Sequence, residues 1–276
     1  MVLSPCCVAF VKKRLDLLLV ERGLAGTREQ ARALIMAGLV TLHGEILDKP
    51  GTKLEESAEL LVAAPPKYVS RGGEKLERAL DAFQLDVSGR VAVDIGASTG
   101  GFTDCLLQRG AARVYAVDVG YGQLDWRLRS DPRVVVMERT NARYLTSLPE
   151  PVDLATVDAS FISLRLVIPP VSRLLKQDGY MVVLVKPQFE AGREQVGKGG
   201  VVRDPRVHRA VLQGLVEWGD REGYGVRRVI ASPIRGPAGN VEFLALVVPG
   251  QPSGPDIASQ IDVALEDAER VSGRRT

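Results

Sequence analysis

The sequence has few cysteines, histidines and aromatic residues, and it has no long apolar run. Its three cysteines, Cys6, Cys7 and Cys105, fit neither a disulfide framework nor a metal-binding spacing, so we predict no bound metal and a reducing, cytoplasmic location. No apolar stretch approaches the roughly 18 residues that a membrane-spanning helix needs, so we expect no membrane partner. The formal net charge is only +2, and any surface for nucleic acid must therefore be local.

The 276 residues are enough for one α/β domain and a small additional domain. At the N-terminus the charges follow a short apolar patch, which is the reverse of their order in a signal peptide. Two prolines in AAPPK favour an extended linker over a helix. These features predict a leader at 1–11, a small α+β domain at 12–64, a linker at 65–71, an α/β domain at 72–250 and a tail at 251–276 that could form one amphipathic helix.

Residues 91–120 are the stretch around which the larger domain is organised. Val91–Ile95 is a short apolar run typical of a buried strand, and a glycine loop, a helix at Phe102–Gln108 and a second strand at Val114–Val117 follow it. Glycine has no side chain to keep a ligand away from the backbone, and Asp118 after the second strand suits the hydroxyls of a ribose. This order predicts a Rossmann-like α/β sheet that binds a nucleotide-type ligand.

Two ligand classes compete for this loop, and a turn that only joins a strand to a helix is a third interpretation. A dinucleotide fingerprint has the spacing G-x-G-x-x-G, whereas Ser98 stands where its second glycine would be. Asp94 precedes the loop, where it would repel a pyrophosphate and favour a cationic ligand. S-adenosylmethionine fits better, because it carries a ribose, an amino group and a sulfonium but no phosphate. The predicted cofactor-binding residues are Asp94, Gly96, Ser98, Gly100, Gly101, Phe102, Asp118, Asn141 and Asp158.

The rest of the larger domain continues the alternation of strands and helices. We expect strands at 134–137, 154–157 and 181–185, and two closing strands within 226–248. We expect helices at Glu74–Phe83, after a break at Gly72-Gly73, at Arg165–Lys176, with Pro169-Pro170 near its start, and at Pro205–Arg221.

Four charged residues stand out at the expected sheet edge: Lys75, Asp158, Lys186 and Glu242. Asp158 and Lys186 follow adjacent parallel strands, and sheet packing does not require a lysine there. Methyl transfer from a sulfonium to a hydroxyl needs an aligned hydroxyl and a base. We assign Lys186 as the base and Asp158 as the residue that aligns it. Lys75 then favours the neutral amine of Lys186 or holds the 2′-oxygen, and Glu242 holds the network. Each of the four could instead form an ordinary surface ion pair.

Basic residues cluster in the first predicted domain and in one later loop. Residues 12–32 carry six cationic and three acidic side chains, a net charge of +3 on two predicted helices. Such a face can meet RNA phosphates, and a solvated face explains the charge equally well. The loop AGREQVGKGGVVRDP is typical of a mobile loop over a polyanion or of a plain surface loop. The predicted RNA-binding residues are Lys12, Lys13, Arg14, Arg28, Arg32, Arg71, Arg193 and Lys198.

The stretch RLDLLLVERGLAGTREQARALIMAGLVTLHGE resembles the S-four-type RNA-binding domain of a small-subunit ribosomal protein. The shared features include Arg14-Leu15-Asp16, Thr27-Arg28 and Ala37-Gly38. The resemblance implies binding of structured RNA through Arg28, Arg32 and their neighbours.

The order Lys75, Asp158, Lys186, Glu242 around DIGASTGGF resembles the tetrad of FtsJ-like RNA 2′-O-methyltransferases. With SRGGEKL, VKPQFE and GGVVRDP, it is similar to the TlyA family over about residues 13–249. The resemblance implies methylation of cytidine ribose in 16S and/or 23S ribosomal RNA, with that RNA or a ribosomal subunit as the partner. The tail resembles the longer type of the family, which acts on both RNAs, whereas SPCCVAF replaces its basic start. We expect a monomer or a homodimer.

Other functions predict other motifs. Methylation of an exocyclic nitrogen is typical of an Asn/Asp-Pro-Pro-aromatic motif, whereas this chain has Asp158-Ala159-Ser160-Phe161. Methylation at pyrimidine carbon 5 needs a nucleophilic cysteine at the reacting edge, and Cys105 lies on the predicted helix after the glycine loop. Two classes without this catalysis stay open: a membrane-lytic, haemolysin-like protein and a non-catalytic ribosome-binding factor.

Overall fold

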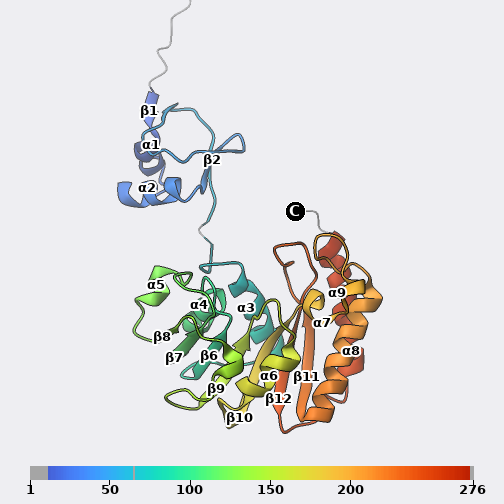
Figure 1. Ribbon diagram of the computed structural model, residues 1–276. Coiled ribbons are helices and arrows are strands. Elements are labelled where there is room, and N and C mark those ends of the chain that lie inside the picture. Colours follow the sequence, from blue (N-terminus) through green and yellow to red (C-terminus); the bar gives the residue numbers. More distant parts are fainter. Residues whose placement is uncertain (1–11, 65, 274–276) are drawn as a thin grey trace, which may run out of the picture. The chain divides into compact units, whose positions relative to one another are not determined.

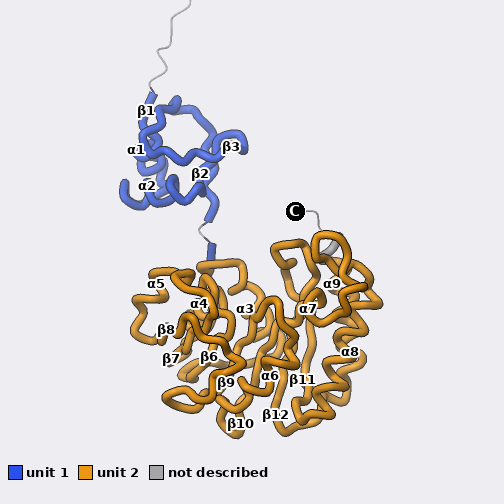
Figure 2. The backbone as a smooth tube through the Cα atoms, in the orientation of Figure 1, with its two compact units in different colours: residues 1–67 blue, residues 68–276 orange. Residues whose placement is uncertain are grey.

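The computed structural model describes residues 12–64 and 66–273, so the predicted leader at 1–11 lies outside the described residues. The chain forms two compact units, Met1–Lys67 and Tyr68–Thr276 (Figure 2). Their boundary falls within the stretch predicted as a linker. The first unit has one hydrophobic core and the second has two, one on each face of its sheet.

The first unit packs two helices against short antiparallel strands (Figure 1). The helices are α1 (Leu15–Glu21) and α2 (Arg28–Met36), and the strands are β1 (Lys12–Arg14), β2 (Val40–Leu42), β3 (Glu45–Ile46), β4 (Lys53–Glu55) and β5 (Leu60–Val62). Thr27 is the N-cap of α2, because its hydroxyl accepts a hydrogen bond from the Gln30 N–H at 3.1 Å. Leu15, Leu19 and Ile35 are fully buried, so the apolar stripes of both helices form the core. This is the small α+β domain that the sequence predicts.

The second unit is built on a seven-stranded sheet in the order β11-β12-β10-β9-β6-β7-β8 (Figure 1). The strands are β6 (Val91–Ile95), β7 (Arg113–Val117), β8 (Val134–Met137), β9 (Val152–Val157), β10 (Leu175–Val185), β11 (Tyr224–Ala231) and β12 (Phe243–Pro249). The neighbouring strands β8, β7, β6, β9 and β10 are parallel to one another. β12 is antiparallel to β10, and β11 is antiparallel to β12. The predicted Rossmann-like α/β fold is confirmed.

Helices cover both faces of this sheet. They are α3 (Gly72–Phe83), α4 (Gly101–Gln108), α5 (Trp126–Arg129), α6 (Leu164–Ser172), α7 (Pro187–Glu190), α8 (Pro205–Glu222) and α9 (Ile257–Gly273), with short 3-10 turns η1 (Ala142–Tyr144) and η2 (Arg193–Gln195). Val93 and Ile95 pack with α6, α8 and α9, whereas Ala92 packs with α3 and α4. Because both faces are buried, the strands are apolar along their length and their functional side chains lie at the ends.

The predicted start of α3 was wrong. The helix begins at Gly72, because the two glycines form its first turn instead of breaking the chain. Gly73 lies so close to the ring of Tyr68 that a Cβ atom at this position would overlap it. The absence of a side chain at these glycines therefore allows close packing at the start of α3.

The predicted extent of α6 was also wrong. It ends at Ser172 instead of Lys176, and Pro169-Pro170 lie near its end instead of its start. Proline has no N–H to donate to the preceding turn, so the pair weakens the helix and favours a short one. β10 consequently begins at Leu175, earlier than predicted.

The tail after β12 carries α9, whose apolar stripe packs against β11 and α8. Ile257, Ile261, Ala264, Leu265 and Ala268 form this stripe. None of the helices in the described ranges is long and apolar enough to cross a membrane.

Candidate active site

The structure brings the four charged residues singled out in the sequence to one cavity of about 350 Å³. Asp158 follows β9 and Lys186 follows β10, and these two strands are parallel neighbours. Glu242 precedes β12, which is antiparallel to β10, so the start of β12 lies at the same edge. Lys75 reaches the cavity from the first turn of α3. Strand direction thus explains why residues far apart in the sequence converge.

The four side chains form two ion pairs. Lys75 Nζ donates to Glu242 Oε2 at 2.5 Å, and only 7% of Lys75 and 2% of Glu242 is exposed. Lys186 Nζ lies 2.6 Å from Asp158 Oδ1 and donates a hydrogen bond to Ser160 Oγ at 2.7 Å. Attraction between such charges is strong because little water screens it. Each lysine is therefore held in position by a carboxylate.

Oδ1 of Asp158 is buried and accepts no hydrogen bond from any residue in the described ranges. The neighbouring ammonium is close enough for an ion pair, but the angles do not make a hydrogen bond. The ammonium of Lys186 compensates the charge of this oxygen, and the oxygen can still accept a hydrogen bond from a ligand.

The glycine loop forms one wall of the same cavity, which is also lined by Gly96, Ser98, Gly101 and Phe102. Gly96 has a φ of +80°, and a Cβ atom there would lie 2.5 Å from the carbonyl oxygen of Asp158. Only glycine combines this backbone conformation with this close approach. Gly100 lines neither this cavity nor the neighbouring one; it is the N-cap of α4 and packs against Leu124 and Leu128.

A second cavity of about 330 Å³ adjoins the first, and both are lined by Gly96, Ser98, Asp158 and Ser160. Asp118 and Asn141 line it from the ends of β7 and β8, and Ala142, Ile162 and Val167 supply apolar surface. Asp118 Oδ2 accepts from the Ser98 N–H at 2.8 Å and Oδ1 from the Gly120 N–H at 2.6 Å. These bonds hold the carboxylate at the mouth of the glycine loop.

Asp94 does not face either cavity, in contrast to its predicted contact with a ligand. It is fully buried, and its oxygens accept hydrogen bonds from Thr103 Oγ1 at 2.7 Å and Thr156 Oγ1 at 2.8 Å. Burial raises the pKa of this carboxyl to about 6, although both hydroxyls oppose the shift. Asp94 therefore supports the loop from beneath.

Sequence reasoning missed two aromatic residues beside Lys186. Phe161 is 90% exposed with a φ of +62°, and its ring centroid lies 5.0 Å from that of Phe189. Lys186 Nζ lies 5.9 Å from the Phe189 ring centroid. An exposed bulky residue with positive φ is strained, and such strain concentrates at functional sites. The available signal was the position of Ser160-Phe161 two residues after Asp158.

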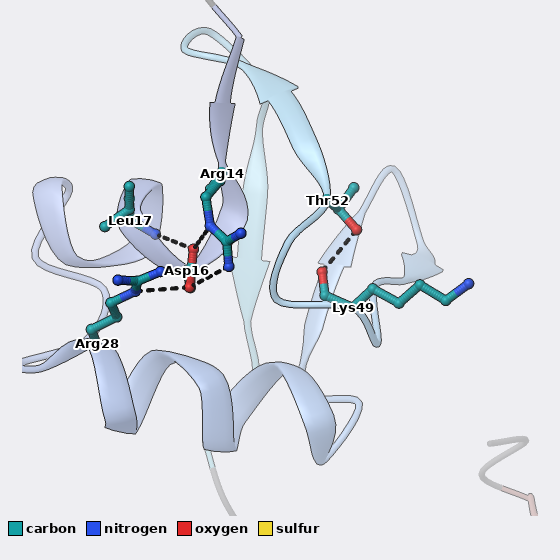
Figure 3. Close-up of polar contacts among 6 residues, drawn as sticks. All are labelled: Arg14, Asp16, Leu17, Arg28, Lys49 and Thr52. Carbon is teal, nitrogen blue, oxygen red and sulfur yellow. Dashed lines mark hydrogen bonds and ion pairs between the residues drawn. The ribbon is translucent and has the colours of Figure 1, made fainter.

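Two of the arginines predicted to bind RNA hold a buried carboxylate in the first unit (Figure 3). Asp16 is 0% exposed, and its oxygens accept from Arg14 Nε at 3.0 Å and Arg28 Nε at 2.9 Å. The hydrogen bonds from Arg14, followed by those from Arg28, lower the pKa of Asp16 to about 2. The sequence shows charges but not their partners, so the prediction missed this structural role.

The remaining predicted RNA-binding residues differ in their environment. Lys13 pairs with Glu21 and Glu56, each at 2.7 Å. Across residues 12–64 and 66–273, no carboxylate lies within ion-pair distance of Lys12, Arg32, Arg71, Arg193 or Lys198, and all five are exposed. Arg71 lines the first cavity, and Arg193 lines an open hollow beside Phe161 and Phe189.

Comparison with protein families matches both units. Residues 68–247 match the FtsJ-like methyltransferase family, and residues 13–60 match the S4 domain. The first match covers most of the chain and contains Lys75, Asp158, Lys186 and Glu242.

Individual relatives support the same family assignment. The chain is 55% identical over 240 residues to "Putative rRNA methyltransferase YqxC" of Bacillus subtilis, covering 84% of each chain. It is 50% identical over 236 residues to "16S/23S rRNA (cytidine-2'-O)-methyltransferase TlyA" of Mycobacterium tuberculosis, covering 84% of this chain and 88% of the relative. A solved structure, "Putative hemolysin from Streptococcus thermophilus", superposes with a TM-score of 0.73 at 45% identity over 96% and 98% of the two chains. The chain therefore belongs to the TlyA branch of the FtsJ-like methyltransferase family, in which an S4 domain precedes the methyltransferase domain.

Proposed function

We propose that this protein transfers a methyl group from S-adenosylmethionine to the ribose 2′-hydroxyl of a cytidine in 16S and/or 23S ribosomal RNA. One observation carries the proposal: two cavities meet at Gly96 and Asp158, and the Lys186–Asp158 pair lies at their junction. A methyl donor and a hydroxyl acceptor can thus approach each other beside a lysine. The named activity of the relative at 50% identity supports the choice of cytidine ribose.

The second cavity fits the nucleoside part of the cofactor. Asp118 offers acceptor oxygens for ribose hydroxyls, and Asn141 offers amide groups to an adenine edge. The close approach at Gly96 and the donorless Oδ1 of Asp158 suit the cationic amino acid part. When bound, S-adenosylmethionine supplies an activated methyl group.

The tetrad residues Lys75, Asp158, Lys186 and Glu242 then act on the proton and the oxygen of the 2′-hydroxyl. With the cofactor bound in the second cavity, its sulfonium would supply the methyl group to the 2′-oxygen, and Lys186 would accept the hydroxyl proton as the base. Asp158 stabilises the ammonium so formed, and Ser160 Oγ orients it through their 2.7 Å hydrogen bond. Lys75, fixed by Glu242, presents its ammonium to the developing charge on the 2′-oxygen.

Surfaces around the cavity suit RNA more than a small acceptor. The exposed ring of Phe161 can stack on an unpaired base, and Arg193 beside it can meet a phosphate. The first unit, which contains the S4 domain, adds exposed cations at Lys12 and Arg32. A ribosomal RNA substrate also implies that the enzyme works in the cytoplasm.

The decisive experiment is transfer of labelled methyl from S-adenosylmethionine to separated 30S subunits, 50S subunits and naked ribosomal RNAs. We expect label on a cytidine ribose with wild type, and a loss of about 10²–10⁴-fold with Lys186→Ala. Lys176→Ala is the matched control, because this lysine lies on the same strand, β10, but does not line the cavity. Its Nζ pairs with Asp153 Oδ1 at 2.8 Å. Label on a base would refute the 2′-hydroxyl mechanism. No label on any substrate, with the cofactor bound, would refute the proposed activity.

A further inference from the structure

A third cavity, of about 490 Å³, lies beside the catalytic cavity in the second unit, and the mechanism above does not use it. Its wall comes from the loop Val201–Arg203, the start of α8, the loop before β12 and the last turns of α9. Arg235 lines both this cavity and the catalytic one. The two cavities are therefore neighbours on either side of the Arg235 side chain.

The lining of this cavity has an excess of positive charge. Arg203 and Arg235 are exposed, and neither has a carboxylate within ion-pair distance in the described part of the chain. By contrast, Arg206 and Arg209 nearby on α8 pair with Asp204 and Asp262. The cavity lining contributes one carboxylate, Glu269 on α9. Two unpaired arginines facing one space favour an anion.

Buried polar groups fix the two loops that carry these arginines. Asn240 is almost fully buried; its Oδ1 accepts from the Val202 N–H at 3.0 Å and its Nδ2 donates to the Gly200 carbonyl at 2.9 Å. His208 lies beneath with Nε2 3.1 Å from the Val202 carbonyl oxygen, and burial lowers the pKa of this imidazole. The arginines are therefore presented from a rigid frame that also carries Glu242, two residues beyond Asn240.

The chemistry of the proposed methyl acceptor, an RNA ribose, indicates which anion this cavity binds. In RNA, the 2′-hydroxyl and the 3′-phosphodiester sit on adjacent carbons of one ribose, so a 2′-oxygen held at Lys186 brings that phosphate to the cavity wall. Resting on the proposed function, we infer that Arg235 binds the phosphodiester 3′ of the target nucleotide, and that the third cavity receives the next nucleoside with Arg203 on its far phosphate. Arg235 thus positions the substrate strand.

Direct RNA binding tests this site independently of turnover. The full-length protein is titrated with naked 16S and 23S ribosomal RNA at several salt concentrations. Each phosphate contact contributes about 0.7–0.9 to the slope of log affinity against log salt. We expect Arg235→Ala and Arg203→Ala each to weaken binding about tenfold and lower that slope by about one, while Arg235→Lys keeps the slope.

Arg206→Ala is the matched control, because this side chain is 91% exposed and paired with Asp204. It should change neither the affinity nor the slope. Cofactor affinity should stay unchanged in all variants. An unchanged slope in Arg235→Ala, or a loss of cofactor binding, would overturn the inference. If wild type transfers methyl groups but Arg235→Ala leaves the salt slope unchanged, this inference alone is refuted. If Arg235→Ala lowers the salt slope but wild type transfers no methyl group, the proposed function alone is refuted.

Discussion

Lys75 Nζ donates to Glu242 Oε2 at 2.5 Å, although 167 positions separate the two residues in the chain. The pair joins the start of α3 to the start of β12, and both side chains are almost excluded from water. Loss of one partner leaves a buried charge without compensation, which costs about 3–5 kcal/mol. The pair therefore links the stability of the second unit to its chemistry.

Glu242→Gln should lower the free energy of unfolding by about 3 kcal/mol, because the Lys75 ammonium stays buried without its carboxylate. The double variant Lys75→Met, Glu242→Leu should recover part of that loss without recovering methyl transfer. Urea denaturation followed by tryptophan fluorescence measures this, since Trp126 and Trp218 both lie in the second unit. Glu150→Gln is the control; it breaks the exposed pair with Arg113 and should cost at most about 1 kcal/mol. Equal losses in both variants would contradict this account.

Gly96→Ala should abolish cofactor binding, because its Cβ atom would lie 2.5 Å from the Asp158 carbonyl oxygen at the junction of the two cavities. Gly122→Ala provides a control for backbone strain alone. Gly122 has a similar φ of +71°, but a Cβ atom there meets nothing within 4 Å. Calorimetric titration with S-adenosylmethionine compares the two. If both variants bind with similar affinity, close approach at Gly96 has no role in the site.

Phe161→Ala should raise the KM for RNA about tenfold or more, since stacking of one base on an aromatic ring contributes about 1–3 kcal/mol. Because Phe161 also lines the second cavity, a parallel titration with S-adenosylmethionine separates a loss of cofactor affinity from a loss of RNA stacking. Phe161→Trp keeps a stacking surface and should retain a low KM. Steady-state methyl transfer at varied RNA concentration separates these effects. A fall in kcat with constant KM would argue against stacking.

Asp94 should make the second unit less stable as the pH rises from about 4 to about 6. Burial raises the pKa of this carboxyl in the folded state above its ordinary value of 3.8, so the folded state holds the proton more tightly than the unfolded state. This contribution is fully present below pH 3.8 and is lost as the pH rises through about 6. The difference in unfolding free energy between wild type and Asp94→Asn, followed by tryptophan fluorescence, should therefore shift by about 3 kcal/mol across this range. A constant difference would show that Asp94 titrates normally.

Asp16 should have the opposite effect in the first unit. The hydrogen bonds from Arg14 and Arg28 lower its pKa in the folded state to about 2, so its contribution is present above pH 3.8 and is lost as the pH falls towards 2. Hydrogen exchange of peptides from residues 12–64, corrected for the intrinsic rate, should show protection falling over this range. Asp16→Asn should have low protection at all pH values. Equal protection of the variant at neutral pH would contradict the role of the ion cluster in Figure 3.

Much of the fold could be predicted because its signals are local. Val91–Ile95 and Val114–Val117 are short apolar runs whose both faces are buried, and the glycines and Asp118 mark where the sheet meets its ligands. The convergence of Asp158 and Lys186 also follows from sequence, because parallel neighbouring strands end at one edge. Helix boundaries at Gly72 and Ser172 were less predictable, since packing decides whether glycine and proline interrupt a helix.

The sequence by itself determined the order of strands, loops and charged residues, and therefore the family and the edge at which its chemistry occurs. Only the tertiary structure decided the partner of each charge. It turned Asp94 inward to two threonines and bound Arg14 and Arg28 to Asp16. Within the described residues, it left Arg203 and Arg235 around a cavity without a carboxylate partner. The physical reason is that an ion pair or a hydrogen bond depends on distance and burial. Both arise from the packing of segments that lie far apart in the chain.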